Sequence, residues 1–297
     1  MNGCLAHPCL SSHRLLQRWV FVLGLALVLA APASFEASLA AGLFCADPPE
    51  SRARIIAIGD HFEFALADGR QARLGGLDLP DPDRGSPASA AAAREFAAKW
   101  LIGREVGLHE LSAKPDRWKR LIVELYAAPV GAAGDAPGGS SVSMALLAAG
   151  LARVWPEPEA RGCATSRLAA EAEARNKSLG LWRDPYYAVV DAADLDKLRE
   201  RDGQFTLVEG TPSRVGEGRS RFFIDFGLRR GFTIVIPKRR AKAFERAGLT
   251  ISALAGAKIR VRGALDDRFG PRMTILEPED IERVEAEGAA KGVGKTP

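Results

Sequence analysis

Histidine and cysteine are both scarce in this chain of 297 residues, which contains four of each. Two of the histidines precede residue 41, so only His61 and His109 would serve the rest of the chain. So few histidines argue against a histidine-rich zinc site and against a Ser/His/Asp catalytic triad. We interpret His61, which directly follows Asp60, as an exposed histidine of a hairpin.

Long apolar runs are also missing from the sequence. The run Trp19–Ala31 is shorter than the ~20 residues that a membrane-spanning helix needs. It follows basic residues and leads into small ones, with candidate cleavage sites at Ala31-Pro-Ala33 and Ser38-Leu-Ala40. This pattern predicts a cleaved signal peptide at residues 1–40 and a secreted or periplasmic product. An uncleaved signal that anchors the chain to a membrane is the alternative.

Two cysteines, Cys45 and Cys163, remain beyond the expected signal peptide. In an oxidising compartment such a pair predicts one disulfide, which would tie the start of the mature chain to the region of Cys163. Two unpaired, buried thiols are the alternative. The pair alone does not predict a metal site, because no third soft ligand accompanies it.

Charge is spread unevenly along the chain, which carries a net +4. Residues 203–297 contain 18 Lys and Arg against 12 Asp and Glu, a net +6, whereas residues 45–202 contain 21 against 24, a net −3. The basic surplus therefore lies in the C-terminal third. It suits a domain that binds a polyanion, and a solvated basic surface is the plainer interpretation.

Alternation of apolar and polar residues predicts a strand-rich first domain at residues 45–187. The Asp68-Gly69 pair is a typical hairpin turn within it. The expected strands are 54–60, 61–68, 71–78, 104–111 and 120–127, and the expected helices are 88–101, 143–153 and 165–179. Five short strands with a helix after the third predict an OB-fold-type barrel, in a chain that is mainly β with helices (α+β).

A second, smaller OB-like β-barrel is expected at residues 203–285, after a linker helix within 188–202 and before a disordered tail at 286–297. Arginines and phenylalanines interleave in its first half. The arginines that we take as candidate nucleic-acid contacts are Arg219, Arg221, Arg229 and Arg230. Such interleaving could follow a phosphate backbone while bases stack on Phe223 or Phe232. Alternatively, the two phenylalanines belong to the core.

Two charged stretches carry most of the functional information. One consists of Asp60 and the run Gln71–Asp81 (QARLGGLDLPD), and the other is Asp116–Arg120 (DRWKR). Their carboxylates suit a hard divalent cation, and the guanidinium groups of Arg73 and Arg120 match a phosphate in a bidentate manner. A metal beside two arginines is the equipment that phosphodiester cleavage requires.

In this order, the motifs resemble the staphylococcal nuclease (thermonuclease, TNase-like) family over about residues 52–182. The resemblance rests on Gly59-Asp60, on Arg73 before Asp78-Leu-Pro-Asp81, on DRWKR, and on Ala149-Gly-Leu-Ala-Arg153. It implies an OB-fold nuclease domain. The downstream stretch from Cys163 to Trp182 is also similar to bacterial members of the family.

By this resemblance Asp60, Asp78 and the backbone carbonyl of Leu79 would hold Ca²⁺, with Mg²⁺ as the lesser alternative. Arg73 and Arg120 would bind the scissile phosphate, and Asp81 would position or deprotonate the attacking water. Arg117 and Trp118 are further candidate contacts of the nucleic acid. The function implied is a Ca²⁺-dependent nuclease that acts on DNA or RNA, and we expect a monomer.

The sequence departs from the family pattern at four positions. Asp81 replaces a glutamate, which shortens the side chain by ~1.5 Å, and Ile58 stands where an additional aspartate is common. His61 replaces a small hydroxyl residue, and Lys119 replaces a glycine. These departures favour an alternative function, a nuclease-like protein with weakened catalysis that serves as a nucleic-acid-binding or envelope interaction scaffold. No motif supports an unrelated envelope module.

Overall fold

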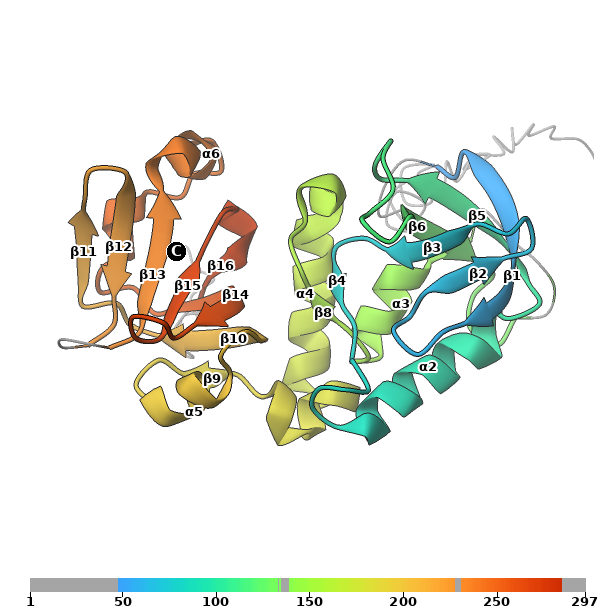
Figure 1. Cartoon of the computed structure of the whole chain (residues 1–297), viewed down its shortest axis with the longest axis horizontal. Coiled ribbons are helices and arrows are strands. Elements are labelled where there is room, and N and C mark those ends of the chain that lie inside the picture. The colour runs from blue at the N-terminus through green and yellow to red at the C-terminus, as the bar shows by residue number, and fades with distance from the viewer. Residues whose placement is uncertain (1–47, 133, 135–138, 228–230, 285–297) are drawn as a thin grey trace, which may run out of the picture.

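The computed structural model describes residues 48–132, 134, 139–227 and 231–284 as two lobes that lie side by side (Figure 1). The expected signal peptide, Cys45, Arg229, Arg230 and the C-terminal tail lie outside these residues. The disulfide therefore stays a prediction, and its second partner, Cys163, is buried. Within the described part of the chain, no helix has both the length and the apolar character to cross a membrane.

The first lobe contains a closed barrel of five strands. Their bounds are β1 (Ser51–Ile58), β2 (Phe64–Leu66), β3 (Gln71–Leu74), β5 (Glu105–Glu110) and β6 (Leu121–Ala127). Hydrogen bonding runs in the order β3-β2-β1-β5-β6, and a parallel pairing of β3 with β6 closes the ring. Alternate residues such as Ile55, Phe64 and Leu66 point inward and are fully buried. The closed barrel confirms the expected OB-type fold.

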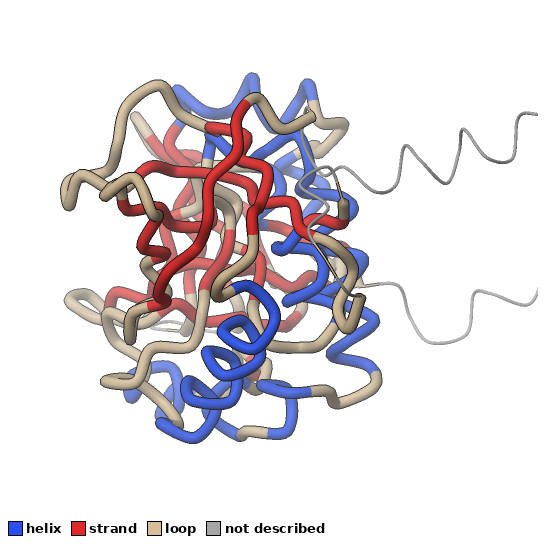
Figure 2. Tube along the Cα trace, turned by 90° about the vertical axis from the view of Figure 1, so that its right-hand side faces the viewer, coloured by secondary structure: helices blue, strands red, loops and turns tan. Residues whose placement is uncertain are grey.

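Helices cover one side and one end of this barrel (Figure 2). They are α2 (Pro87–Leu101), α3 (Val142–Ala148) and α4 (Ala164–Asn176), and the shorter elements are β4 (Leu77–Asp78), β7 (Ser140–Ser141), β8 (Arg153–Val154), η1 (Pro158–Cys163), η2 (Gly180–Arg183) and η3 (Pro185–Tyr187). Ser86 caps α2, because its hydroxyl accepts a hydrogen bond from the Ser89 backbone N–H. The helix α3 ends before residue 153, where we expected its end. Gly150 adopts a left-handed φ of 70° there, and the chain turns into β8.

The second lobe is built on an eight-stranded, barrel-like sheet of the described residues. Its strands are β9 (Val190–Asp191), β10 (Phe205–Gly210), β11 (Arg214–Glu217), β12 (Arg221–Asp225), β13 (Thr233–Pro237), β14 (Ile259–Asp266), β15 (Arg272–Thr274) and β16 (Ile281–Arg283). Its helical segments are α5 (Leu195–Glu200), η4 (Lys238–Arg240), α6 (Ala241–Arg246), η5 (Ile251–Leu254) and η6 (Pro278–Asp280). The strand order is β11-β12-β13-β15-β14-β10-β9, and β16 pairs with β14.

The connection between the lobes differs from the expected linker helix. Only α5 is helical, and the two residues of β9 pair in parallel with β10 in the second sheet. Local capping explains the short helix, because the Asp194 carboxylate accepts a hydrogen bond from the Lys197 N–H at 3.2 Å. The structure therefore places the start of the second sheet at Val190.

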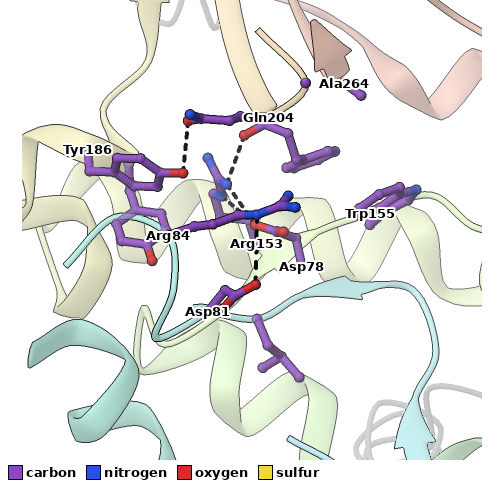
Figure 3. Close-up of a pocket in the computed structure, with 12 residues that line it drawn as sticks. Asp78, Asp81, Arg84, Arg153, Trp155, Tyr186, Gln204 and Ala264 are labelled. Atoms are coloured by element: carbon purple, nitrogen blue, oxygen red, sulfur yellow. Dashed lines mark hydrogen bonds and ion pairs between the residues drawn. The ribbon is translucent and has the colours of Figure 1, made fainter. Parts of the chain in front are cut away.

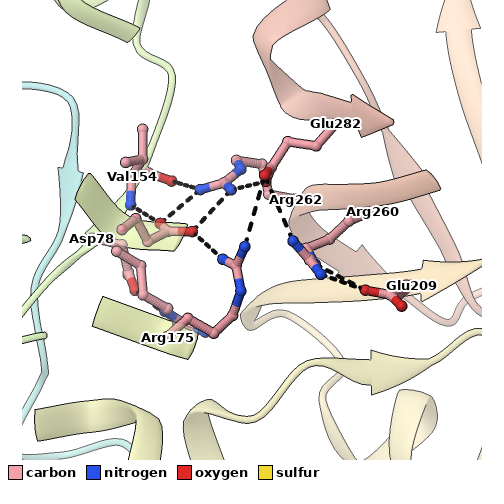
Figure 4. Close-up of polar contacts among 9 residues, drawn as sticks. Asp78, Val154, Arg175, Glu209, Arg260, Arg262 and Glu282 are labelled. Carbon is pink, nitrogen blue, oxygen red and sulfur yellow. Dashed lines mark hydrogen bonds and ion pairs between the residues drawn. The ribbon is translucent and has the colours of Figure 1, made fainter. Parts of the chain in front are cut away.

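Each lobe has its own hydrophobic core, and a buried charged network joins the two (Figure 4). Arg262 of β14 makes a bidentate pair with Glu171 of α4, with N···O distances of 2.8 and 3.0 Å. Arg262 also donates to the Val154 carbonyl at 2.9 Å, and Glu171 accepts from the Val154 N–H at 2.6 Å. Arg175 donates to Glu171 at 2.8 Å, and Glu282 pairs with Arg262. The second lobe is therefore fastened to β8.

A partly buried acid in the second lobe, Asp280, predicts how stability depends on pH. Burial raises the pKa of Asp280 to about 7, so the folded state favours the neutral carboxyl. The free energy of unfolding should therefore fall by about 1 kcal/mol per pH unit as the pH rises from 4 to 7. Asp280→Asn should flatten this slope, because an amide does not bind a proton in this pH range. The fold should be kept, since the amide oxygen can still accept the hydrogen bond from the Glu277 N–H, at 3.0 Å in the structure.

Urea unfolding at a series of pH values measures this slope, with the exposed Asp196→Asn variant as the control. A slope that survives in Asp280→Asn would show that another group carries it.

Candidate active site

The candidate site lies around a two-glycine corner that joins β3 to β4. A side chain at Gly75 would collide with Leu111 and Ile122, and a Cβ at Gly76 would lie 2.1 Å from Nη1 of Arg167. Arg167, which pairs with the buried Glu124, donates to the Gly75 carbonyl at 3.0 Å. The "GG" in RLGGLD is therefore required by close packing of this corner against a buried ion pair.

The two predicted phosphate-binding arginines share one carboxylate. Asp116 accepts from Nε of Arg120 at 2.8 Å and lies 3.4 Å from Nε of Arg73. Burial alone would raise the pKa of Asp116, but hydrogen bonds from Arg120 and Trp118 hold it below its usual value. The carboxylate therefore stays charged and holds both arginines in place.

A second carboxylate, that of Glu157, already binds the guanidinium group of Arg73. Glu157 accepts from both terminal nitrogens of Arg73, at 2.9 and 3.0 Å, and also from the Gly76 N–H at 2.9 Å. This bidentate contact has the geometry that a phosphate would use. A phosphate could reach Arg73 only if Glu157 moved.

Asp78 and Arg153 face each other across the β4–β8 pair. Nε and Nη2 of Arg153 lie 2.8 and 2.7 Å from one carboxylate oxygen of Asp78. Burial raises the pKa of Asp78, and the charge of Arg153 opposes that rise. Arg153 also donates to the Phe205 carbonyl of the second lobe at 3.0 Å, so the second lobe helps to hold Arg153 against Asp78.

The predicted calcium ligands do not form a ready cation site in this arrangement. Asp60, exposed after β1, makes an ion pair with Arg94 of α2, and Asp78 is paired with Arg153. Each carboxylate already has a cationic partner, so this donor set does not fit a metal ion as it stands. In the described residues, the one group of three His, Cys, Asp or Glu side chains with ligand atoms within 4.8 Å of one another is His61, Asp81 and Asp83.

Asp81 and Arg120 both line an open cavity of ≈ 630 Å³. Arg84, Arg117 and Trp118 also line it. Trp118 is 58% exposed, and the guanidinium of Arg117 lies 3.8 Å from its ring centroid. The cavity therefore offers an aromatic surface and three guanidinium groups beside the two carboxylates of Asp81 and Glu63.

A smaller cavity of ≈ 230 Å³ lies between the lobes, next to the first (Figure 3). Asp81 and Arg84 line both cavities. Asp78 and Leu79 line this one, and Trp155 of the first lobe stacks on Phe205 of the second with ring centroids 4.9 Å apart. The predicted residues of the DLPD motif thus lie at the junction of the lobes.

Lys119, in the turn before Arg120, adopts a left-handed φ of 64°. This is the conformation for which glycine is the usual residue, so the backbone keeps the shape of a glycine turn although the residue differs. Asp116 stabilises the turn by accepting hydrogen bonds from the backbone N–H groups of Trp118 and Arg120, at 2.9 and 3.0 Å.

The predicted contacts of the second lobe lie on its surface where they are described. Arg219 and Arg221 are exposed, Phe223 is 36% exposed, and Phe232 is fully buried in the core. Phe223 is therefore accessible for stacking, whereas Phe232 belongs to the core.

Three charged residues of the site were not singled out from the sequence. Arg153 and Glu157 neutralise Asp78 and Arg73, and Arg84 approaches Asp81 at 4.0 Å. The cross-strand pairing of Asp78 with Arg153 depends on two-residue strands, which give no periodic signal. Arg153 was visible in the motif Ala149-Gly-Leu-Ala-Arg153, but its partner was not.

The first lobe is thus an OB-type barrel that carries two arginines on a shared aspartate. Residues 71–184 match the model of the family described as "Staphylococcal nuclease homologue", so this part of the chain is similar to that family. The match includes the predicted residues from Arg73 to Arg120 and leaves out Asp60. It suggests a nuclease-like function and a nucleic-acid substrate, and family members are typically metal-dependent. No curated protein shows significant similarity to the chain.

Proposed function

We propose that the protein is a secreted or periplasmic phosphodiesterase that hydrolyses DNA or RNA in the larger cavity of the first lobe. The observation that carries this proposal is the arrangement of that cavity, where Asp81 lies on a wall shared with Arg117 and Arg120. Guanidinium groups bind a phosphate, and they stabilise the charge that develops when the bond breaks.

In this mechanism Asp81 acts as the general base that accepts a proton from the attacking water. Asp81 is accessible, and its Oδ1 lies 3.4 Å from Nδ1 of His61. A carboxylate in this position can accept a proton from water, and the adjacent imidazole can share it. Trp118 is exposed and can stack against a base, which would align the phosphate backbone of the nucleic acid with Arg120.

A divalent cation would neutralise the phosphate, and we expect calcium because the predicted ligands are all oxygen atoms. Asp60 and Asp78 would first have to leave Arg94 and Arg153, so we assign no step of the reaction to the ion. Calorimetric titration of the mature chain with calcium measures this binding directly, apart from any activity.

Cleavage of labelled single-stranded DNA and RNA tests the proposed reaction. The mature chain should cleave in calcium and stop in a chelator. Asp81→Asn should slow cleavage about a hundredfold, because the amide cannot accept the proton. Glu95→Gln, an exposed change on α2, should leave the rate unchanged. A rate that is unaffected by Asp81→Asn would refute the role of this carboxylate, and no cleavage at all would refute the enzymatic function.

A second candidate function is binding without hydrolysis. The ion pairs Arg73–Glu157 and Asp78–Arg153 favour it, because they occupy the groups that a phosphate and a cation would need. Binding by surface arginines should weaken steeply with added salt and should not require calcium. Salt-sensitive binding in chelator, together with no cleavage in calcium, would identify this function.

A further inference from the structure

In the second lobe, β11 and β12 lie farthest from the nuclease-like lobe (Figure 1). Strands β11, β12, β13 and β15 lie side by side there. Because side chains alternate along a strand, Phe223 shares the outer face with Arg221, whereas Ile224 is buried inside. The register sets Phe223 opposite Gly216 on one side and Val235 on the other.

A cavity of ≈ 570 Å³ lies over this face and is bordered by two phenylalanine rings. Phe223 rises from β12, and Phe269 belongs to the loop between β14 and β15. Phe269 is 83% exposed. The guanidinium of Arg272 lies over the Phe269 ring, 4.7 Å from its centroid. The Phe269 ring is therefore exposed and lies beside a guanidinium group, an arrangement on which a planar ring can stack while the cation attracts an anion.

Two glycines, Gly216 and Gly218, leave the Phe223 ring uncovered. A Cβ at Gly216 would meet only the Phe223 carbonyl, at 3.9 Å, so a side chain there would project into open space. A Cβ at Gly218 would lie 3.0 Å from the Phe223 ring and would press on it. With hydrogen at both positions, the ring is accessible to a flat ligand.

The charges around the two rings are predominantly positive once internal pairs are set aside. Arg214 is paired with Asp225, and Lys238 is paired with Glu217. Arg272 lines the cavity, and Arg219 and Arg221 are exposed beside it without lining it. None of these three arginines has an ion-pair partner among the described residues. Residues 203–297 also carry a net +6. A ligand that complements this surface is anionic and offers flat apolar rings.

We propose that this face is a second binding site, specific for single-stranded nucleic acid. Bases stack on Phe269 and Phe223, and the phosphates lie along Arg272, Arg221 and Arg219. A single strand meets both requirements, because its bases are free to leave each other and its backbone is a polyanion. A duplex hides its bases and offers only the charge. The site rests on the second lobe alone and does not depend on hydrolysis in the first.

Fluorescence anisotropy with a labelled deoxythymidine strand of ~12 nucleotides, within the range that one OB-type domain covers, tests this site. The mature chain is used in chelator to prevent cleavage, and in the Arg120→Ala background to weaken the first cavity. Phe269→Ala should reduce the affinity about tenfold, as expected for one lost base stack. Phe269→Tyr should retain it, and Phe223→Leu should reduce it as Phe269→Ala does.

Leu276→Ala is the matched control, because Leu276 is exposed on the same lobe and does not line the cavity. It should leave the affinity unchanged. Equal binding of the strand and its duplex, or an affinity untouched by both phenylalanine variants, would overturn the proposal. If Phe269→Ala cleaves a dinucleotide as fast as the unmodified chain, the first cavity works independently of the second lobe. If the unmodified chain cleaves nothing, the proposed hydrolysis fails, but the binding of the single strand to the second lobe is unaffected.

Discussion

Replacing Glu171 with glutamine is expected to destabilise the protein by about 3–5 kcal/mol. The side chains of Glu171 and Arg262 are both fully buried, and three groups depend on this carboxylate. Burial alone would raise the pKa of Glu171, but the charge of Arg262 holds it below its usual value. The neutral amide would leave the buried Arg262 with only Glu282 to balance it, and the two lobes would separate more easily.

The midpoint of urea unfolding measures this loss. Glu173→Gln is the matched control, since Glu173 lies two residues along the same helix and makes an exposed pair with Lys177. The control should leave the midpoint unchanged. The double variant Glu171→Leu, Arg262→Met should recover much of the loss, because a buried pair can often be replaced by apolar residues. Equal midpoints for the two glutamine variants would show that the network contributes little.

Arg120→Ala is expected to reduce cleavage of nucleic acid about a thousandfold, if the larger cavity is the active site. Arg120 is the arginine of the predicted pair that lines this cavity, and Asp116 aims it there. Loss of one fixed donor to a developing charge costs on the order of 10²–10³ in rate. The cation of Arg120 also lies over Trp118, 4.8 Å from the ring centroid, so substrate binding should weaken as well.

Arg120→Lys should recover only part of the rate, because an ammonium cannot bind the phosphate in a bidentate manner. Arg70→Ala removes an arginine from the hairpin at Asp68, outside the cavity, and should leave cleavage unchanged. Initial rates on single-stranded DNA under saturating calcium make the comparison. If Arg120→Ala and Arg70→Ala cleave equally fast, the reaction does not occur in this cavity.

The strands of the first barrel could be predicted because their apolar residues alternate over several positions and because the hairpin turn is distinctive. The shared position of Arg73 and Arg120 could also be predicted, since Arg73 lies on β3 and Arg120 directly precedes β6, and these two strands pair. In contrast, the pairing of Asp78 with Arg153 follows from a contact between two very short strands. No local pattern announces such a contact.

The boundary between the lobes was harder to predict for a related reason. The charged segment from 189 to 201 has helical composition, but β9 gains hydrogen bonds from β10 that only the folded second lobe can offer. Tertiary pairing therefore overrides a weak local preference. The buried pair of Arg262 and Glu171 is similarly hidden, because each residue has the ordinary appearance of a surface charge in its own segment.

The close approach of Gly76 and Arg167 ties together two positions that are 91 residues apart. Any side chain at position 76 would displace the Arg167 guanidinium, and a shorter residue at position 167 would leave Glu124 with its charge uncompensated. The three positions should therefore co-vary. Related chains with a side chain in the middle of this corner should lack the arginine on the helix and should carry a neutral residue on β6.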